Sequence, residues 1–348
     1  MKTKAPASQQ QASNQITEGV IWKQLLIFFF PILFGTFFQQ LYNTADAIIV
    51  GNFVGKEALA SVGGPASTII NLLVGFFVGL SSGATVVISQ HYGGGDDQKV
   101  SDSVHTSIAL AIAGGAVMMV LGLASARFAL SAMATPSDIM EPSLTYMRIY
   151  YLGIIPSMIY NMGSGILRAV GDSKRPLYFL IAACLVNIAL DLILVARLDL
   201  GVAGAAIATI MSQLISAILT VIALMRTTDS YRLVVSRIRF HKHLLFSIVK
   251  IGLPAGLQSA MYSISNLLIQ SSINSFGTDT IAAWTAYAKV DSIFWMIMSA
   301  YGVSATTFAG QNFGAGKYDR IKKSVRICLG LAAATSIALS FIVLQFGG

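Results

Sequence analysis

Long runs of hydrophobic residues, separated by short polar or glycine-containing segments, dominate the chain from about residue 23 onward. A bilayer is crossed by roughly 20 apolar helical residues, and nine runs reach that length. The runs are continuous and lack period-two alternation, which excludes a transmembrane β-barrel. The pattern predicts an all-α, polytopic integral membrane protein with spans at about 23–49, 58–88, 103–126, 143–167, 176–196, 201–225, 245–272, 280–308 and 324–346.

Composition and charge agree with this pattern and exclude a soluble enzyme. Hydrophobic residues make up 55% of the 348 residues and charged residues only 11%, whereas soluble domains carry about 25% charged residues. Seventeen Lys and Arg residues lie in the N-terminal tail and the even-numbered connections between spans, against three in the odd-numbered ones. The positive-inside rule therefore predicts a multi-pass protein of the cell inner (plasma) membrane with a cytoplasmic N-terminus. We attribute the net charge of +8 to this orientation and expect no nucleic-acid partner.

The sequence contains an internal repeat. Seven residues between positions 84 and 104 recur 221 positions later, including Gln90 and Gly93 as Gln311 and Gly314. The offset covers six spans, so both copies enter the membrane from the same side, as in transporters built from parallel repeats. A complete second copy would extend well past residue 348. We therefore expect about nine helices of an expected twelve, in two parallel six-helix repeats of which the second is incomplete.

The repeat divides the chain into four parts. Residues 1–22, rich in Gln, Ser and Ala, are predicted to form a disordered cytoplasmic tail. Residues 23–225 are predicted to form an N-terminal six-helix lobe and residues 226–244 a cytoplasmic inter-lobe linker. Residues 245–348 would then be the first three helices of an incomplete C-terminal lobe.

Small residues recur every four positions on two of the spans. The second span carries Gly75, Gly79 and Gly83, and such stripes allow helices to approach closely. We interpret the stripe as a packing or sliding surface within a lobe and not as a binding site.

Two aspartates inside spans require an explanation, because an acid at mid-bilayer costs about 2.5–3.5 kcal/mol on insertion scales. Asp46 on the first span and Asp191 on the fifth lie about 8–9 Å inside the outer end, at 1.5 Å per residue. Asn187 lies one turn before Asp191 on the same face, and Thr209 on the sixth span lies at a similar depth. Together these groups form a candidate proton or cation site. The competing interpretation is that either aspartate reaches the outer interface or caps a neighbouring helix.

No residue pattern typical of an enzyme, a disulfide framework or a zinc site occurs. Cys184 and Cys328 lie in apolar stretches with no Cys or His at ligand spacing, so both are predicted to be packing residues. The four histidines lie in or beside predicted cytoplasmic connections, and no pair has the HExxH spacing. We expect no catalysis, no cofactor and no bound metal, apart from Na⁺ as an alternative to H⁺ at the four polar residues.

Several stretches are recognisable in combination. They are residues 39–46 (QQLYNTAD), Gly51 followed by residues 58–60 (ALA), residues 168–172 (RAVGD) with Pro176, residues 187–191 (NIALD), and residues 310–317 (GQNFGAGK). Through them the chain resembles the MATE family, the multidrug and toxic compound extrusion transporters, and within it the bacterial and archaeal DinF-like branch. The resemblance runs from about residue 20 to the end of the sequence.

The resemblance implies two six-helix lobes that face each other in a V. It also implies export of cationic or amphipathic compounds in exchange for incoming H⁺ or Na⁺, by alternating access. In the resembling branch, the coupling site of the first lobe has an Asp on helix one, an Asn and an Asp four apart on helix five, and a Thr on helix six. These positions carry over to Asp46, Asn187, Asp191 and Thr209.

Two further implications concern the cavity and the coupling ion. Gln39, Asn43 and Asp291 are candidate residues of the substrate cavity. Another branch of the family uses an acidic residue on helix seven, and the seventh span here, residues 245–272, has none. This difference favours proton coupling through the first lobe.

The function predicted is therefore a secondary active multidrug efflux antiporter, acting as a monomer on small cationic or amphipathic molecules in a lipid bilayer. The alternative is a lipid-linked oligosaccharide flippase of the related superfamily, which would need several cationic residues for a pyrophosphate. Few Lys or Arg residues occur within the spans. An enzyme is disfavoured by the missing catalytic groups, and a channel by the duplicated lobes, which fit alternating access better.

Overall fold

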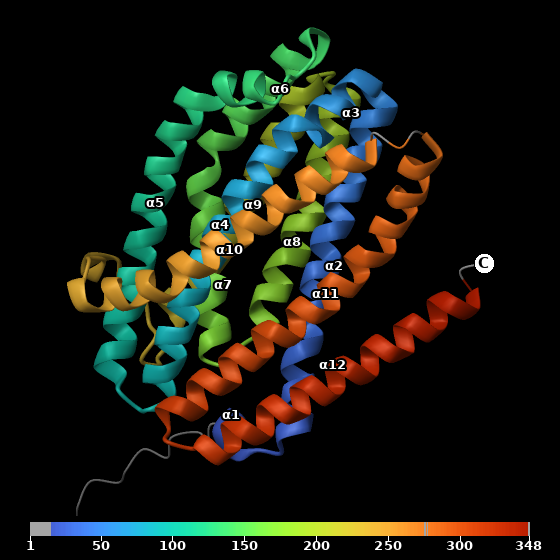
Figure 1. The fold of residues 1–348 in the computed structure, drawn as a ribbon. Coiled ribbons are helices and arrows are strands. Elements are labelled where there is room, and N and C mark those ends of the chain that lie inside the picture. Colours follow the sequence, from blue (N-terminus) through green and yellow to red (C-terminus); the bar gives the residue numbers. More distant parts are fainter. Residues whose placement is uncertain (1–14, 275, 277, 347–348) are drawn as a thin grey trace, which may run out of the picture.

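The computed structural model describes residues 15–274, 276 and 278–346, and these residues fold almost entirely into helices (Figure 1). The helices lie in chain order as α1 (Gln15–Glu18), α2 (Ile21–Phe53), α3 (Lys56–Gly63), α4 (Pro65–Gly93), α5 (Asp97–Ala132), α6 (Ser137–Leu152), α7 (Ile154–Ala169), α8 (Lys174–Asp191), the π-helix η1 (Leu192–Arg197), α9 (Gly201–Arg226), the 3₁₀ turn η2 (Val235–Arg237), α10 (Lys242–Asn274), α11 (Thr278–Gly314) and α12 (Tyr318–Phe346).

Eight helical segments of the described part are long and apolar enough to cross a membrane. They correspond to eight of the nine predicted spans. The remaining span, predicted at 143–167, is present as α6 and α7, two helices of 16 residues that meet at Gly153. The prediction of an all-helical, polytopic membrane protein is thus confirmed, and the fourth span differs only in being broken.

Large apolar side chains cover the outside of these helices. Phe128 is 76% exposed and Leu185 is 65% exposed. In water such surfaces would be costly, but lipid tails are as apolar as leucine, so they are the surfaces expected to face a bilayer.

The buried apolar residues form two clusters. The larger one lies mainly among α3 to α9. The smaller one joins the first half of α2 to α11, where the Phe29 ring stacks on Tyr301 at 4.2 Å and the Phe28 ring meets Phe308 edge-on at 6.1 Å. Helix α2 therefore packs both against the helices that follow it and against the last two helices, α11 and α12. In Figure 1 the C-terminal end of α12 points away from the rest of the molecule.

The glycine stripe of α4 is the place where α10 crosses it. A Cβ on Gly79 would overlap the backbone of Gly256, and a Cβ on Gly83 would overlap the backbone of Gly252. The prediction of a packing surface therefore holds, but the helix that packs there is α10, which lies outside the predicted lobe of residues 23–225. The stripe joins the first group of helices (α2–α9) to the second group (α10–α12), and only glycine permits this backbone-to-backbone contact.

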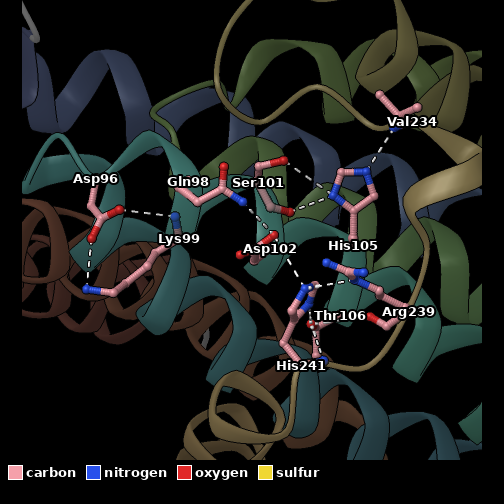
Figure 2. Close-up of polar contacts among 10 residues, drawn as sticks. All are labelled: Asp96, Gln98, Lys99, Ser101, Asp102, His105, Thr106, Val234, Arg239 and His241. Atoms are coloured by element: carbon pink, nitrogen blue, oxygen red, sulfur yellow. Dashed lines mark hydrogen bonds and ion pairs between the residues drawn. The ribbon is translucent and has the colours of Figure 1, made fainter.

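Residues between α9 and α10, inside the predicted 226–244 linker, fold back onto α5 (Figure 2). His105 Nδ1 lies 2.7 Å from the Ser101 carbonyl oxygen, and His105 Nε2 accepts a hydrogen bond of 3.0 Å from the Val234 N–H. Because a carbonyl can only accept, Nδ1 carries the proton and Nε2 is the acceptor. Thr106 makes a second contact, 3.1 Å from His241 Nδ1.

Beside this network, Asp96 is the N-cap residue of α5 (Figure 2). Its carboxylate accepts a hydrogen bond of 3.1 Å from the Lys99 N–H and pairs with Lys99 Nζ at 2.8 Å. The side-chain and backbone hydrogen bonds from Lys99 lower the pKa of Asp96 below its ordinary value. The ionised Asp96 carboxylate, which these bonds favour, thus holds the turn before α5.

The predicted disordered tail covers residues 1–22, of which residues 1–14 lie outside the described part of the chain. Residues 15–22 depart from the prediction. They include α1 and the start of α2, and the Ile16 side chain is only 7% exposed.

Candidate functional site

A cavity of about 280 Å³ lies inside the first group of helices, and one face of α2 forms part of its wall. Gln39, Asn43 and Asp46 are spaced by four and three residues, so they lie one above the other on that face. All three line the cavity. Two of the three predicted cavity residues, Gln39 and Asn43, are therefore on the same wall as the predicted coupling residue Asp46.

Asp46 on α2 and Asp191 at the end of α8 lie close enough for their carboxyl groups to influence each other electrostatically. Among the described residues no standard hydrogen bond joins them. Asp46 is 7% exposed and Asp191 is 0% exposed. Two buried carboxylates near each other are costly when both are ionised and neither has a partner.

Several oxygen and nitrogen atoms around this pair lack a conventional partner. Among the described residues, no standard hydrogen bond is made by five buried side-chain atoms: Asp46 Oδ1, both carboxylate oxygens of Asp191, and both polar atoms of the Asn187 amide. Asn187 is 0% exposed and lies one turn before Asp191. Buried polar atoms are nearly always paired. Such a group of unpaired oxygens fits a small hard cation or a proton.

The helix geometry changes directly after Asp191. The chain continues as the π-helix η1 over six residues, Leu192 to Arg197. Single π-turns in helices are rare and occur frequently at functional sites. Asp191 is thus at a junction where the backbone departs from the regular α-helix.

Thr209 on α9 lines the same cavity as Asp46. Its hydroxyl donates 3.0 Å to the Ala205 carbonyl within α9, and Tyr146 lines the cavity close by. Tyr146 in turn interacts electrostatically with Asp46. Of the four residues predicted as the coupling site, Asp46 and Thr209 thus line one cavity, whereas Asn187 and Asp191 are not among its described lining residues. Asp191 lies near Asp46, and Asn187 lies one turn before Asp191.

The remaining wall is polar but carries little charge. Tyrosines and amides make up much of it, and the Gln213 Nε2 donates 3.4 Å to the Tyr150 hydroxyl. Asp46 is the one ionisable acid among the described lining residues, and no Lys or Arg is among them. Besides those named, the polar lining residues are Tyr42, Ser67, Asn71, Ser157, Tyr160, Asn161, Ser212 and Ser216.

The cavity and the glycine contact with the second group lie at opposite ends of α4. The α4 residues that line the cavity are Ser67, Ile70, Asn71 and Val74. The glycine contacts with α10 and α11 run from Gly75 to Gly94, later in the chain. The end of the bundle beyond the cavity is thus closed by direct backbone packing between the two groups.

Asp291 lies apart from this site. It is on α11 in the second group, where its Oδ1 accepts a hydrogen bond of 3.4 Å from the Tyr287 hydroxyl on the same helix. It is not among the residues that line the cavity. The structure therefore does not bring Asp291 together with Gln39 and Asn43.

Sequence reasoning missed the tyrosines of the wall. Tyr146 and Tyr150 on α6 are four residues apart, and Ser157 and Tyr160 follow on α7 at intervals of seven and three. Polar residues at this spacing in an otherwise apolar span form one stripe. The stripe was available in the sequence, but aromatic residues in a membrane segment are more commonly interfacial or packing residues.

No group of three or more His, Cys, Asp or Glu side chains in the described part could hold a metal ion. Both cysteines are buried and unpaired with each other.

Comparison with known proteins agrees with this fold. The family profile described as MatE matches residues 31–193 and 254–348. The chain is 30% identical to "Probable multidrug resistance protein YpnP" of Bacillus subtilis over 322 residues, covering 88% of this chain and 68% of that protein. It is 27% identical over 318 residues to "Probable multidrug resistance protein YoeA" of the same organism, covering 89% and 68%.

The fold itself is similar to that of a solved transporter. A structure described as the outward-facing conformation of a multidrug resistance MATE family transporter of the MOP superfamily superposes with a TM-score of 0.89, at 23% identity. The superposition covers 97% of this chain and 75% of that one. The chain therefore belongs to the MATE family of multi-pass membrane transporters.

Proposed function

We propose that this chain exports small cationic or amphipathic molecules by antiport, in exchange for inward movement of H⁺ or Na⁺. Residues 23–225 and the helices from residue 245 onward would act as two lobes that rock against each other. The protein would lie in the plasma membrane with its N-terminus in the cytoplasm, as the distribution of Lys and Arg favours.

The proximity of Asp46 and Asp191 carries the proposal. A buried carboxylate pair with unpaired oxygens is costly unless it holds a proton or a cation. One partner, Asp46, lines the cavity, so loading the pair changes the charge of the cavity wall. Binding of the coupling ion and binding of a positively charged substrate would therefore oppose each other, as antiport requires.

The oxygens of the predicted coupling residues suit either H⁺ or Na⁺ as the coupling ion. Asp46, Asp191, Asn187 and Thr209 supply carboxylate, amide and hydroxyl oxygens, which are the ligands that hard cations prefer. If Na⁺ is the ion, these four residues would hold it; if H⁺, the two carboxylates would share it.

The rest of the wall fits a cationic or amphipathic substrate. Tyrosine rings attract cations through their faces, and the cavity has several of them beside one carboxylate. The alternative, a flippase for lipid-linked oligosaccharides, would need cationic side chains for a pyrophosphate. The absence of Lys and Arg from the described cavity wall favours the antiporter.

Alternating access is supported by the position of the cavity relative to the closed end. Backbone contacts from Gly75 to Gly94 join the two groups on one side of the cavity. With the N-terminus in the cytoplasm, that closed end is cytoplasmic and the conformation is outward-facing. The opposite state would require the contact between α4 and α10 to separate.

The proposal is tested by transport in proteoliposomes containing the purified chain. Efflux of a fluorescent cation is measured under a pH gradient alone and under a sodium gradient alone. We expect one of the two gradients to drive efflux, and Asp46→Asn and Asp191→Asn each to abolish it. Asp291→Asn is the matched control, because this acid is also on a predicted span but does not line the cavity.

Two results would contradict the proposal. One is efflux that depends on neither gradient in the wild-type chain. The other is efflux that survives Asp46→Asn and Asp191→Asn as fully as it survives Asp291→Asn.

A further inference from the structure

The residues before α2 belong to the first group by sequence, but they bind to the second group. The Ile16 carbonyl oxygen accepts hydrogen bonds from Arg320 Nε at 3.1 Å and Arg320 Nη2 at 3.0 Å. The Gly19 carbonyl accepts a further one from the same guanidinium. Lys317 Nζ donates 3.1 Å to the Thr17 carbonyl.

These contacts explain why so short a helix is stable. Helix α1 has four residues, and helices of that length do not form alone. Its last carbonyl groups have no partner within the helix. Arg320 and Lys317, at the start of α12 and in the turn before it, supply cationic donors to those carbonyls, as residues at a helix C-terminus do.

The same segment also contacts the first group. The Ile16 side chain is 7% exposed, and its Cδ1 lies 3.1 Å from where a Cβ on Gly171 would be, in the turn between α7 and α8. Beside it, Gln311 Nε2 on α11 donates 2.7 Å to the Ala169 carbonyl at the end of α7. Ile16 thus fills a junction formed by both groups.

This junction is at the closed end of the bundle. Gln311, which bonds to Ala169, is also the residue whose backbone lies against Gly93 on α4. The segment therefore crosses the boundary between the groups where they are in backbone contact.

We propose that residues 15–20 form a strap that holds this end of the bundle closed and must detach before it can open. The hydrogen bonds run from Lys317 and Arg320 of the second group to main-chain carbonyls of residues that precede the first group. Separation of the two groups therefore breaks these bonds. The strap would thus add to the stability of one conformation over the other. This inference rests on the alternating-access part of the proposed function.

The first experiment measures the separation of the groups directly. Spin labels are placed at the exposed positions Lys174 and Lys322, on α8 and α12, with Cys184 and Cys328 replaced by Ala. Distances are measured by double electron–electron resonance in lipid nanodiscs. We expect Arg320→Ala and Ile16→Ser each to add or enlarge a longer-distance population. The matched control is Arg326→Ala, an exposed cation two turns further along α12, which should leave the distribution unchanged.

The second experiment reports on the strap itself and guards against simple misfolding. Thr17 is 6% exposed, so a Thr17→Cys thiol should react slowly with a water-soluble maleimide. Arg320→Ala should increase its labelling rate about ten- to hundredfold, the range expected when hydrogen bonds to a charged group are lost. Arg320→Lys, which keeps the charge but loses the fork of donors, should give an intermediate rate.

The outcomes separate the strap from the transport mechanism. If Thr17→Cys labelling accelerates while the distances stay those of the closed end, the segment does not hold the groups together and the strap is refuted. Unchanged labelling in Arg320→Ala would refute it as well. If the distances respond but no gradient drives efflux, the strap stands and the proposed antiport fails.

Discussion

Gly93 on α4 lies against the backbone of Gln311 on α11, and the reverse contact also occurs, with Gly314 on α11 against the backbone of Gln90 on α4. The two contacts join equivalent positions of the repeat. Gln90 is equivalent to Gln311 and Gly93 to Gly314, each 221 positions later in the sequence. A contact in which residue i meets j and the equivalent of i meets the equivalent of j is the signature of a two-fold axis. The internal repeat therefore places its axis between α4 and α11, at the closed end.

This arrangement predicts that bulk at the glycine contacts will push the two groups apart. In Gly83→Val the new Cβ would overlap the backbone of Ile248 and Gly252, which cannot move as a flexible side chain can. Overpacking of this kind costs about 1–3 kcal/mol, enough to shift a two-state equilibrium by about ten- to hundredfold. Distances between spin labels at Lys174 and Lys322 would show a larger open population.

The control for this prediction is Gly302→Val on α11, where a Cβ would meet no atom within 4 Å. It tests whether a branched residue alone is harmful in these helices. Equal distance distributions in Gly83→Val and Gly302→Val would show that the glycine contact does not determine the closed conformation.

A second prediction concerns stability at the carboxylate pair. Asp46→Asn keeps the shape of the side chain and supplies an amide donor to the Asp191 carboxylate, which lacks one among the described residues. We expect the melting temperature in detergent to be equal to or above that of the wild type, while efflux is lost. Asp46→Leu, which supplies no donor, should lower it, because Asp191 is then left buried without a partner, at about 1–3 kcal/mol. A lower melting temperature for Asn than for Leu would contradict the pairing.

The sequence was sufficient to predict the spans and to single out two aspartates that are buried within them. Long apolar runs determine which segments cross a bilayer, and an acid inside such a run is conspicuous because it is costly there. Asp46 and Asp191 were therefore singled out as acids inside apolar spans at one depth, and both are buried near each other in the structure. The coupling role of these residues stays a prediction.

Other features depended on tertiary contacts that no local pattern encodes. The glycine stripe of α4 predicts a close neighbour but does not say which helix, and the neighbour is α10 of the second group. The polar composition of residues 1–22 favoured disorder, yet α1 is held by Arg320, about 300 residues away in the sequence. Asp291 was assigned to the cavity by its chemistry, but its position on α11 keeps it out of the wall.

A third prediction concerns the segment between α9 and α10. In His105→Ala the Val234 N–H loses its acceptor, and the segment loses one of its attachments to α5. Amide hydrogen exchange of residues 230–240 should accelerate by about tenfold, as expected for the loss of one hydrogen bond. His243→Ala is the control. This histidine lies in the first turn of α10, and among the described residues its ring makes no hydrogen bond to α5. Equal protection in both variants would show that His105 does not anchor the segment.

A fourth prediction separates the tyrosine hydroxyl from its ring at the site. Tyr146→Phe keeps the stacking on Tyr150, with centroids 6.4 Å apart, but removes the hydroxyl that reaches Thr209. The ring still contributes to the wall for a substrate, so the apparent KM for the exported cation should change little. The apparent KM for the coupling ion should rise about two- to tenfold, the effect of losing one neutral hydrogen bond. Tyr151→Phe, on the same helix but not part of the cavity wall, is the matched control.

The same reasoning makes Thr209→Val and Tyr146→Phe non-additive. Each variant removes one end of the same interaction, so the double variant should be no worse than the more severe single one. Additive effects would mean that the two hydroxyls act separately, and the route from Thr209 through Tyr146 to Asp46 would then not exist. Because Asp46 Oδ1 lacks a standard hydrogen-bond partner among the described residues, this route is the one by which Thr209 can influence the charge of the carboxylate pair without touching it. The double-variant cycle in the proteoliposome assay thus decides whether the hydroxyl belongs to the coupling site or only lines the cavity.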